Sequence, residues 1–379
     1  MLGKNPLKGG MKMNSEYKVV RAERLTSFCQ RVFESLGVPS QDAETVAEVL
    51  VLGDLRGVES HGVARLQRYF RGLKDRVMVP QPVLRVVQET PCTAVLDGGA
   101  ALGQVAGKQG MEIAIAKAWQ YGTGFVTVRN SNHFGIAGYY SQMALQHDLI
   151  GISLSNSTPD VVPTFGRTVM IGTNPISVAV PTGRERPFLL DMATAVVPSG
   201  KLETYNRKGQ KIPLGWAVDE RGRPCDDPGR VWNNMRGGIG GGLLPLGGAG
   251  EEFSGHKGYG IGLVVDILSG VLSGSANTTL VYPKTPEGKP LPSLVGHFFG
   301  CLRVDFFRPL EEFKRDMDDM IRRLKNSPKA EGSERIYIHG EKEFAFEEKY
   351  RLEGIPIYHK VYEGLKAIAA EAGVSFHVD

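Results

Sequence analysis

The stretch from Phe125 to Gly138, Phe-Val-Thr-Val-Arg-Asn-Ser-Asn-His-Phe-Gly-Ile-Ala-Gly, decides the fold class. Four strand-forming residues, Phe125–Val128, lead into a polar turn, and a helical pattern begins at Gly135. Strands are also expected at 84–87, 94–96, 150–154, 176–180 and 188–190, and helices at 104–121, 135–146 and 258–273. This alternation predicts an α/β domain. Hairpin-like turns such as Gly172–Pro175 favour a mixed sheet over a purely parallel one.

The segments before and after this region have a helical pattern. Helices are expected over Glu16–Leu36, from Ser40 as N-cap through Leu52, and after Ser60. A charged helical pattern returns at 310–326 and 358–372. We therefore predict a discontinuous helical domain, made by residues 1–75 together with 308–379, and an α/β domain over residues 76–307.

The composition is typical of a globular protein and excludes several classes of partner. The chain has 379 residues, of which 41% are hydrophobic and 23% charged. Its net charge of +4 is too slight for nucleic-acid or membrane-surface binding. No apolar run reaches the roughly 20 residues of a membrane span, and the start lacks a signal-peptide core, so a cytoplasmic protein is expected. The cysteine spacing and the lack of HExxH predict no metal site.

The helix expected after Ser60 has an apolar and a polar face. Its buried face is predicted from helical spacing: Val63, Leu66, Phe70 and Leu73. On a separate face, His61, Arg65 and Tyr69 follow one another at steps of four residues. A guanidinium can grip both oxygens of a carboxylate, and a histidine titrates near neutral pH. The row could therefore hold a small carboxylate, although a solvated polar helix face is an open alternative.

Two further polar residues stand where strands end. His133 lies in the polar turn after the Phe125 strand, where active-site groups of α/β folds tend to occur. A histidine that only caps the following helix is the alternative. Asp191 ends an apolar strand, where a carboxylate can orient a histidine or a ribose hydroxyl, although a simple strand-end aspartate is the commoner case.

Glycines mark two other segments. Residues 237–250 are glycine-rich and are expected to form a mobile loop, but they contain no GxGxxG, and the standard Rossmann fingerprint is absent from the chain. The stretch His256–Gly262 opens a helix and has three glycines in its first turns, with Lys257 at the positive end of the helix dipole. It predicts a phosphate site, and close helix packing through small residues is the alternative.

Six segments, in this order, resemble the type 2 malate/L-lactate dehydrogenases. They are Arg56–Leu66, Asn130–Tyr140, Gly172–Pro175, Leu190–Thr194, His256–Gly260 and Gly296–Phe299. This group is distinct from the Rossmann-type malate and lactate dehydrogenases, and it includes sulfolactate and ureidoglycolate dehydrogenases, diketogulonate reductase and a cyclic imine reductase. The resemblance implies a homodimeric NAD- or NADP-dependent oxidoreductase, in which the mixed-sheet domain over 76–307 is a non-Rossmann dinucleotide-binding domain.

The resemblance also implies roles for individual residues. The acid–base histidine of the family matches His133 or His61. Arg65 and Tyr69 match positions that contact the substrate, and Ser60 with Asp191 match groups that support His61. The implied cofactor contacts are Ser157, Asp191, Met192, Ala193, His256, Lys257, Gly340, Glu341 and Lys342.

The chain departs from the family pattern at three places near the cofactor. Ala195 stands where a serine is usual, Gly166–Arg167 replaces paired glycines, and the glycine-rich segment 237–250 is longer than expected. These departures leave the choice between NAD and NADP open.

The expected reaction interconverts a small-molecule 2-hydroxy acid and its 2-oxo acid, with malate and oxaloacetate as first candidates. Arg65 would clamp the C1 carboxylate, His133 would exchange a proton with the C2 oxygen, and His61, tied to Ser60, would polarise that oxygen or relay the proton. The alternatives are reduction of sulfopyruvate, pyruvate, diketogulonate or a cyclic imine, or oxidation of ureidoglycolate. A nucleotide- or carboxylate-binding protein without turnover is the rival from another class.

Overall fold

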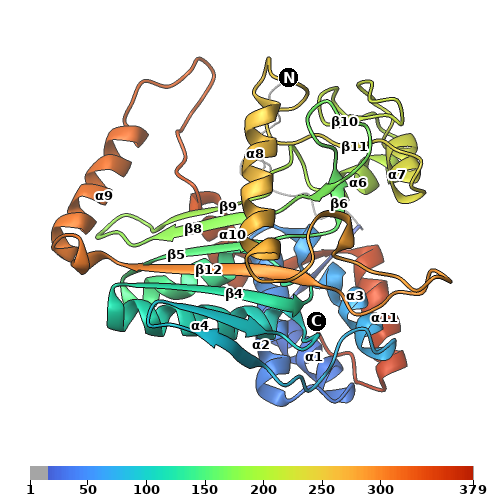
Figure 1. The fold of residues 1–379 in the computed structure, drawn as a ribbon, viewed down its shortest axis with the longest axis horizontal. Helices are drawn as coiled ribbons and strands as arrows, with labels where there is room; N and C mark the ends of the chain where they lie inside the picture. Colours follow the sequence, from blue (N-terminus) through green and yellow to red (C-terminus); the bar gives the residue numbers. More distant parts are fainter. Residues whose placement is uncertain (1–15, 379) are drawn as a thin grey trace. The chain divides into compact units, whose positions relative to one another are not determined.

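The computed structural model describes residues 16–378 (Figure 1). The described chain divides into two compact units. Unit 1 takes in the described residues up to Arg71 and those from Glu343 onward, and unit 2 is Gly72–Lys342. The helix α3 (Leu66–Lys74) crosses the first boundary and α10 (Glu341–Glu353) crosses the second. The mixed α/β class predicted from the sequence is confirmed.

Unit 1 is mainly helical. It contains α1 (Ala22–Ser35), α2 (Ser40–Leu55) and α11 (His359–Ala372). The helix α1 buries Leu25, Phe28 and Val32, whose spacing places them on one face of the helix. The predicted helix at 16–36 is wrong in its first turn, because β1 (Tyr17–Val20) pairs antiparallel with β13 (Ile355–Tyr358). That partner is more than 330 residues away, so local periodicity carries no sign of it.

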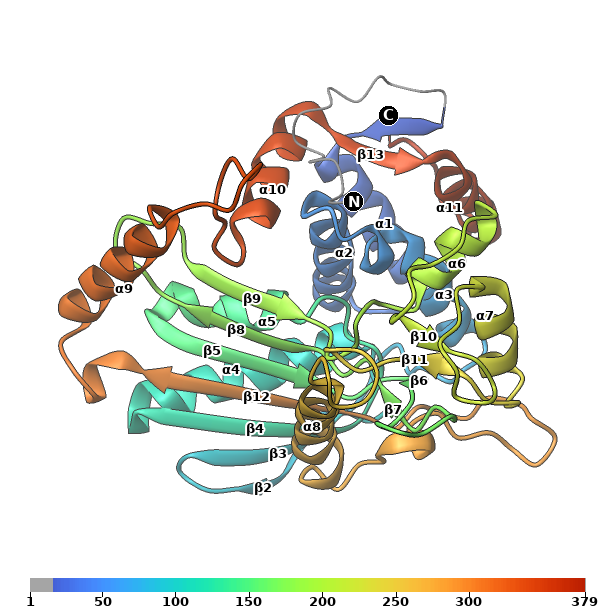
Figure 2. The same cartoon turned by 90° about the horizontal axis from the view of Figure 1, so that it is seen from above.

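Unit 2 is built on a seven-stranded mixed sheet (Figure 2). The strand order is β2 (Arg85–Glu89), β3 (Thr93–Asp97), β4 (Thr123–Ser131), β12 (Val295–Arg303), β5 (Leu149–Ser155), β8 (Ile176–Val180) and β9 (Phe188–Met192). Only β3 and β4 run parallel, and the crossover between them contains α4 (Gly103–Tyr121). All other neighbours in this sheet are antiparallel. The mixed sheet that the hairpin turns predicted is therefore confirmed.

The central strand β12 was not expected from the sequence. It lies between β4 and β5 and pairs with both (Figure 1). Gly296 and Gly300 interrupt its apolar pattern and conceal its strand character. Gly296 is needed for close packing, since a Cβ atom at this position would lie 1.9 Å from the carbonyl oxygen of Ser269.

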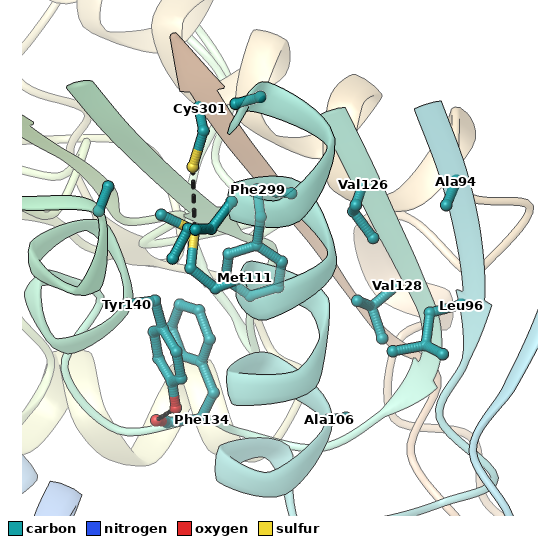
Figure 3. Packing of buried hydrophobic residues seen from close by; sticks show 14 of the residues in the cluster. Ala94, Leu96, Ala106, Met111, Val126, Val128, Phe134, Tyr140, Phe299 and Cys301 are labelled. Atoms are coloured by element: carbon teal, nitrogen blue, oxygen red, sulfur yellow. Dashed lines mark hydrogen bonds between the residues drawn. The ribbon is translucent and has the colours of Figure 1, made fainter. Parts of the chain in front are cut away.

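One face of the sheet is covered by α4 and α5 (Gly138–Met143), and the core of unit 2 lies between these helices and the strands (Figure 3). Gly110 lets α4 approach closely, because a Cβ atom there would lie 2.8 Å from the ring of Phe299 and 2.9 Å from Val128. Phe299 is fully buried in this cluster together with Met111. Truncating such a buried phenylalanine to alanine typically costs about 3 to 5 kcal/mol.

A smaller four-stranded sheet has the order β10 (Ala217–Val218), β11 (Gly242–Leu243), β6 (Pro159–Val161) and β7 (Ile171–Gly172). The helices α6 (Gly200–Arg207) and α7 (Pro228–Arg236) pack near it through a shared cluster of buried residues. The segment 237–250 is therefore not a loop throughout, since β11 lies within it and pairs with β10 and β6.

The last elements of unit 2 are α8 (Gly255–Asp266), which continues as a π-helical turn at Ile267–Val271, and α9 (Leu310–Lys325). The carboxylate of Asp318 in α9 accepts hydrogen bonds from the backbone N–H groups of Gly183, Arg184 and Glu185. These bonds tie α9 to unit 2, so the compact units divide at 71 and 342, whereas the boundaries predicted from the sequence are 75 and 308. The domain assignment stays a prediction.

Candidate active site

The loop after β4 carries His133 and is held in place by its neighbours. Asn132 Nδ2 donates hydrogen bonds to the carbonyls of Ala101 (2.8 Å) and Ala100 (3.2 Å). The start of α4 packs directly on the loop, since a Cβ atom at Gly103 would lie 2.1 Å from the carbonyl oxygen of Asn132. The half-buried His133 accepts a bond from the N–H of Gly135 through Nδ1 (3.4 Å). The histidine therefore stands on a loop with little freedom to shift.

Asp191, near the end of β9, is joined to this loop. Its Oδ2 accepts a hydrogen bond of 2.7 Å from the N–H of Gly138, the first residue of α5. A Cβ atom at position 138 would lie 2.8 Å from the same oxygen, so a larger residue here would displace the Asp191 carboxylate. The structure thus connects two predicted site residues, His133 and Asp191, through the start of α5. Gly138 belongs to the motif Asn130–Tyr140, but its contact with Asp191, 53 residues away, could not be predicted from the local sequence.

Ser157 lies beside the turn that follows β7. Its backbone N–H donates to Asn174 Oδ1 (3.2 Å), and its hydroxyl lies 3.4 Å from that of Thr173. The N–H of Thr194, just after β9, donates to the carbonyl of Thr173 (2.8 Å). Asn174 Nδ2 in turn donates to the carbonyl of Gly262 in α8 (3.0 Å). These contacts connect the predicted cofactor segments around Ser157, Asp191–Ala193 and α8.

Gly255 and Gly258 at the start of α8 serve close packing, whereas a Cβ atom at Gly260 would meet no atom within 4 Å. Cβ atoms at Gly255 and Gly258 would each lie 1.9 Å from a backbone carbonyl oxygen. The backbone N–H groups of His256 and Lys257 already donate within the chain. What this helix start offers a phosphate is the exposed side chains of His256 and Lys257.

The donor set of this region suits a nicotinamide dinucleotide. The carboxylate of Asp191 at a strand end can bind ribose hydroxyls, and the hydroxyls of Ser157 and Thr173 can bind a sugar or an amide. The side chains of His256 and Lys257 can face phosphate oxygens. All five residues lie in unit 2.

Gly340–Lys342 are positioned differently. The carbonyl of the neighbouring His339 accepts a bond from Leu189 near the start of β9, whereas Asp191 stands near the strand's end. The carboxylate of Glu341 pairs with Lys325 (3.0 Å) and Arg335 (3.1 Å). These ion pairs give Glu341 a structural role, and a cofactor contact through Gly340, Glu341 or Lys342 stays a prediction.

The segment 60–69 in unit 1 is not the single helix expected from the sequence. Two short 3₁₀ turns, Glu59–His61 and Val63–Arg65, precede α3, with the extended residue Gly62 between them. The break is stabilised by Asp54, whose Oδ2 accepts a bond of 2.7 Å from the N–H of Val63. The predicted i+4 row is therefore wrong, and Tyr69 is fully buried. The apolar face was predicted correctly, since all four of its residues are buried.

The broken segment nevertheless brings three of its polar residues together. The Ser60 hydroxyl lies 2.9 Å from His61 Nδ1, so Ser60 orients the imidazole instead of capping a helix. Arg65 Nε donates to the carbonyl of Ser60 (2.6 Å). Burial, together with the charges of Arg65 and Arg68, lowers the pKa of His61 to about 4. His61 is therefore neutral at physiological pH.

Asp54 is a functional candidate that the sequence analysis missed. Burial raises its pKa to about 8, against the hydrogen bond from Val63, which lowers it. A Cβ atom at Gly62 would lie 2.0 Å from its Oδ1. Gly62 in the Ser60-His-Gly motif was the one sequence feature that pointed to Asp54, because a glycine leaves space for a side chain from another element.

Two kinds of feature are absent from residues 16–378. No group of three or more His, Cys, Asp or Glu residues there could hold a metal ion. Within the same range, no helix is long and apolar enough to cross a membrane.

Comparison with known proteins gives consistent matches over nearly the whole chain. A family model described as malate/L-lactate dehydrogenase matches residues 20–366. Malate dehydrogenase from Pyrococcus horikoshii is 50% identical over 362 residues, which cover 96% of this chain and 98% of that protein. L-sulfolactate dehydrogenase from Methanocaldococcus jannaschii is 41% identical, covering 91% of this chain and 94% of that protein.

Solved structures agree with these matches. The Pyrococcus horikoshii malate dehydrogenase structure has a TM-score of 0.87 at 48% identity and covers 96% of this chain and 98% of its own. The structure of malate dehydrogenase from Entamoeba histolytica has a TM-score of 0.90 at 36% identity. The match covers 95% of this chain and 99% of that one. The chain therefore belongs to the malate/L-lactate dehydrogenase family, as its six ordered motifs predicted.

Proposed function

We propose that this protein is a nicotinamide-dependent dehydrogenase that interconverts malate and oxaloacetate. The observation that carries the proposal is the hydrogen bond from Gly138 to Asp191, which joins the His133 loop to the predicted cofactor segments. The choice of malate is supported by relatives named malate dehydrogenase that are 50% and 49% identical. Sulfopyruvate is the second candidate substrate, because relatives named L-sulfolactate dehydrogenase and malate/(S)-sulfolactate dehydrogenase are 41% and 36% identical.

Each residue has a distinct task in the proposed reaction. His133 gives its proton to the C2 oxygen during reduction and takes it back during oxidation. Arg65 binds the C1 carboxylate with its terminal nitrogens, because its Nε is already bonded to Ser60. The neutral His61, oriented by Ser60, is suited to polarise the C2 oxygen, whereas its low pKa does not suit it to act as the acid near pH 7. A bound nicotinamide ring supplies or accepts the hydride.

The cofactor is tested by Lys257→Ala. We expect the KM for the dinucleotide to rise about tenfold, from the loss of one phosphate contact, while the KM for the oxo acid stays near its wild-type value. Fluorescence titrations with NAD and with NADP measure the preference and the loss in the same experiment. Wild-type affinity of Lys257→Ala for both dinucleotides would contradict the proposed phosphate contact.

We further propose that the protein is a cytoplasmic homodimer. An apolar row on α8 and the π-helical turn is exposed: Ile261, Val264, Ile267, Val271 and Leu272. An exposed apolar row of this length favours burial against another protein surface. Light scattering of the purified protein tests the dimer, and a monomer at assay concentrations would contradict it.

The activity is tested with a panel of acids and both cofactors. Malate, lactate, sulfolactate, ureidoglycolate and the corresponding oxo acids are assayed by nicotinamide absorbance, together with diketogulonate and a cyclic imine carboxylate. We expect the highest kcat/KM with malate and oxaloacetate. If no compound gives turnover while a dinucleotide still binds, the rival interpretation of a non-catalytic binding protein is favoured.

A further inference from the structure

His297 occupies an unusual place for a titratable side chain, because it is fully buried in the central strand β12. Its Nδ1 lies 2.9 Å from the hydroxyl of Ser155 on β5, and its Nε2 lies 2.9 Å from the hydroxyl of Ser131 on β4. Burial lowers its pKa to about 3. The ring is therefore neutral and presents one N–H and one lone pair between the two serines.

The same ring contacts residues on both sides of His133. Besides Ser131, it has a hydrogen-bond contact with the backbone of Asn132. On the other side of His133, the ring of Phe134 stacks on His297 with a centroid distance of 4.6 Å and an angle of 1° between the planes. The carbonyl of Phe134 accepts a hydrogen bond from the hydroxyl of Tyr140 in α5. One side chain of β12 thus holds the loop before and after His133.

Packing alone does not explain an imidazole at this position. An apolar side chain would fill the space without the cost of removing two polar nitrogens from water, which is a few kcal/mol unless both are hydrogen-bonded. Both nitrogens are bonded here, and one of the two serine partners ends β4, directly before the loop. The geometry therefore points to a task at the loop.

We propose that His297 is a positioning residue that fixes the His133 imidazole relative to the substrate oxygen. The proposal rests on the proposed function, in which His133 exchanges the proton. Ser131 fixes the entrance of the loop, and the stacked Phe134 fixes its exit. A displacement of a reacting group by about 1 Å can cost on the order of 10² in rate, so the arrangement should act on kcat and leave ligand binding unchanged.

The test compares His297→Ala with His297→Gln. The amide of glutamine keeps a donor and an acceptor but loses the ring that stacks on Phe134. We expect His297→Ala to lower kcat about 10²-fold, with the KM of the oxo acid and the Kd of the dinucleotide changed less than about twofold. The kcat of His297→Gln should be at least fivefold higher than that of His297→Ala, a factor that corresponds to about one hydrogen bond.

A matched pair of serines separates positioning from loss of stability. Ser155 and Ser153 are both buried on β5 and lie two residues apart, so their side chains point to the same face of the sheet. Ser155 contacts His297, whereas the Ser153 hydroxyl has no hydrogen-bond partner among the described residues. We expect Ser155→Ala to lower kcat about fivefold, from the loss of one hydrogen bond, and Ser153→Ala to leave it unchanged.

A measurement that needs no turnover separates the positioning role of His297 from the proposed dehydrogenase function. In protein carrying ¹³Cε1-labelled histidine, the His133 signal is assigned by its loss in His133→Gln. We expect this signal to shift in His297→Gln and in Ser155→Ala but not in Ser153→Ala. If wild-type protein turns over no acid of the panel, the proposed function fails while this signal still tests the positioning. The positioning role would be overturned if the His133 signal did not shift in His297→Gln. A wild-type kcat in folded His297→Ala would overturn it as well.

Discussion

The segment around His61 in unit 1 and the loop around His133 in unit 2 each present a histidine, but their surroundings differ. Burial and the charges of two nearby arginines, Arg65 and Arg68, lower the pKa of His61 to about 4. The His133 loop is joined through Gly138 to the carboxylate of Asp191. Burial, reinforced by the two cations, keeps the His61 imidazole neutral and suited to hydrogen bonding, whereas a proton carrier must gain and lose a proton during turnover. This difference supports the proposed roles, in which His133 exchanges the proton and His61 polarises the substrate oxygen.

The largest expected effect is that of His133→Gln. The amide keeps a hydrogen-bond donor but cannot titrate, so turnover should fall by roughly 10² to 10⁴ while binding of oxo acid and dinucleotide survives. His61→Gln is the matched control, and its turnover should fall less than that of His133→Gln. Steady-state kinetics in both directions measure the two variants. An inactive His61→Gln beside a near-normal His133→Gln would reverse the assignment and place the proton donor on the Ser60–His61 segment.

Arg65→Lys tests the proposed substrate contact of the His61 segment. An ammonium cannot supply the planar two-point grip on a carboxylate, so kcat/KM should fall on the order of 10². Arg71→Lys on α3 is the control, because its partner is the surface carboxylate of Glu371 and its loss should leave kcat/KM unchanged. Normal kinetics for folded Arg65→Lys would remove Arg65 from the substrate site.

Asp54→Asn tests whether burial keeps the Asp54 carboxyl protonated in the folded protein, through the pH dependence of stability. The unfolded carboxyl ionises near pH 4, whereas burial raises the folded pKa to about 8, so folding takes up a proton between these values. The free energy of unfolding of the wild type should therefore fall, by a few kcal/mol, as the pH rises from about 4 to about 8. In Asp54→Asn this contribution should be absent.

Urea unfolding at several pH values measures how steeply the free energy of unfolding changes with pH in the wild type and in Asp54→Asn. Glu23→Gln on the exposed side of α1 is the control and should keep the wild-type slope. Equal slopes for wild type and Asp54→Asn would show that the carboxyl of Asp54 ionises normally in the folded protein.

The smallest expected effect belongs to Gly138→Ala at the start of α5. The added Cβ atom would lie 2.8 Å from Asp191 Oδ2, and relieving this overlap should cost about 1 to 3 kcal/mol of stability. Thermal unfolding with Gly364→Ala as control measures it, because a Cβ atom at Gly364 in α11 meets no atom within 4 Å and should stabilise by about 0.5 to 1 kcal/mol. Equal stability of Gly138→Ala and wild type would mean that the Asp191 contact is dispensable.

Regular elements with strong local patterns were predictable. The helices expected at 310–326 and 358–372 correspond to α9 and α11 within one residue at each end, because their periodicity and charge are continuous. The strands β1 and β12 were not predictable in the same way. Their partners lie more than 100 residues away, and hydrogen bonding to distant strands outweighs a weak local preference.

The sequence by itself determined the family and most of the candidate residues. Motifs such as Ser60-His-Gly and Asn130–Tyr140 are contiguous, and their chemistry depends on residue type. Only the tertiary structure decided which groups meet: Gly138 with Asp191, His297 with both Ser131 and Ser155, and Asp54 with the backbone of Val63. The contacts of Asp191 and His297 join different elements of unit 2, and the contact of Asp54 breaks a helix that spacing alone predicted. The physical reason is that burial and hydrogen bonding are properties of packed surroundings, so the pKa of His61 or His297 emerges only after distant segments of its unit have come together.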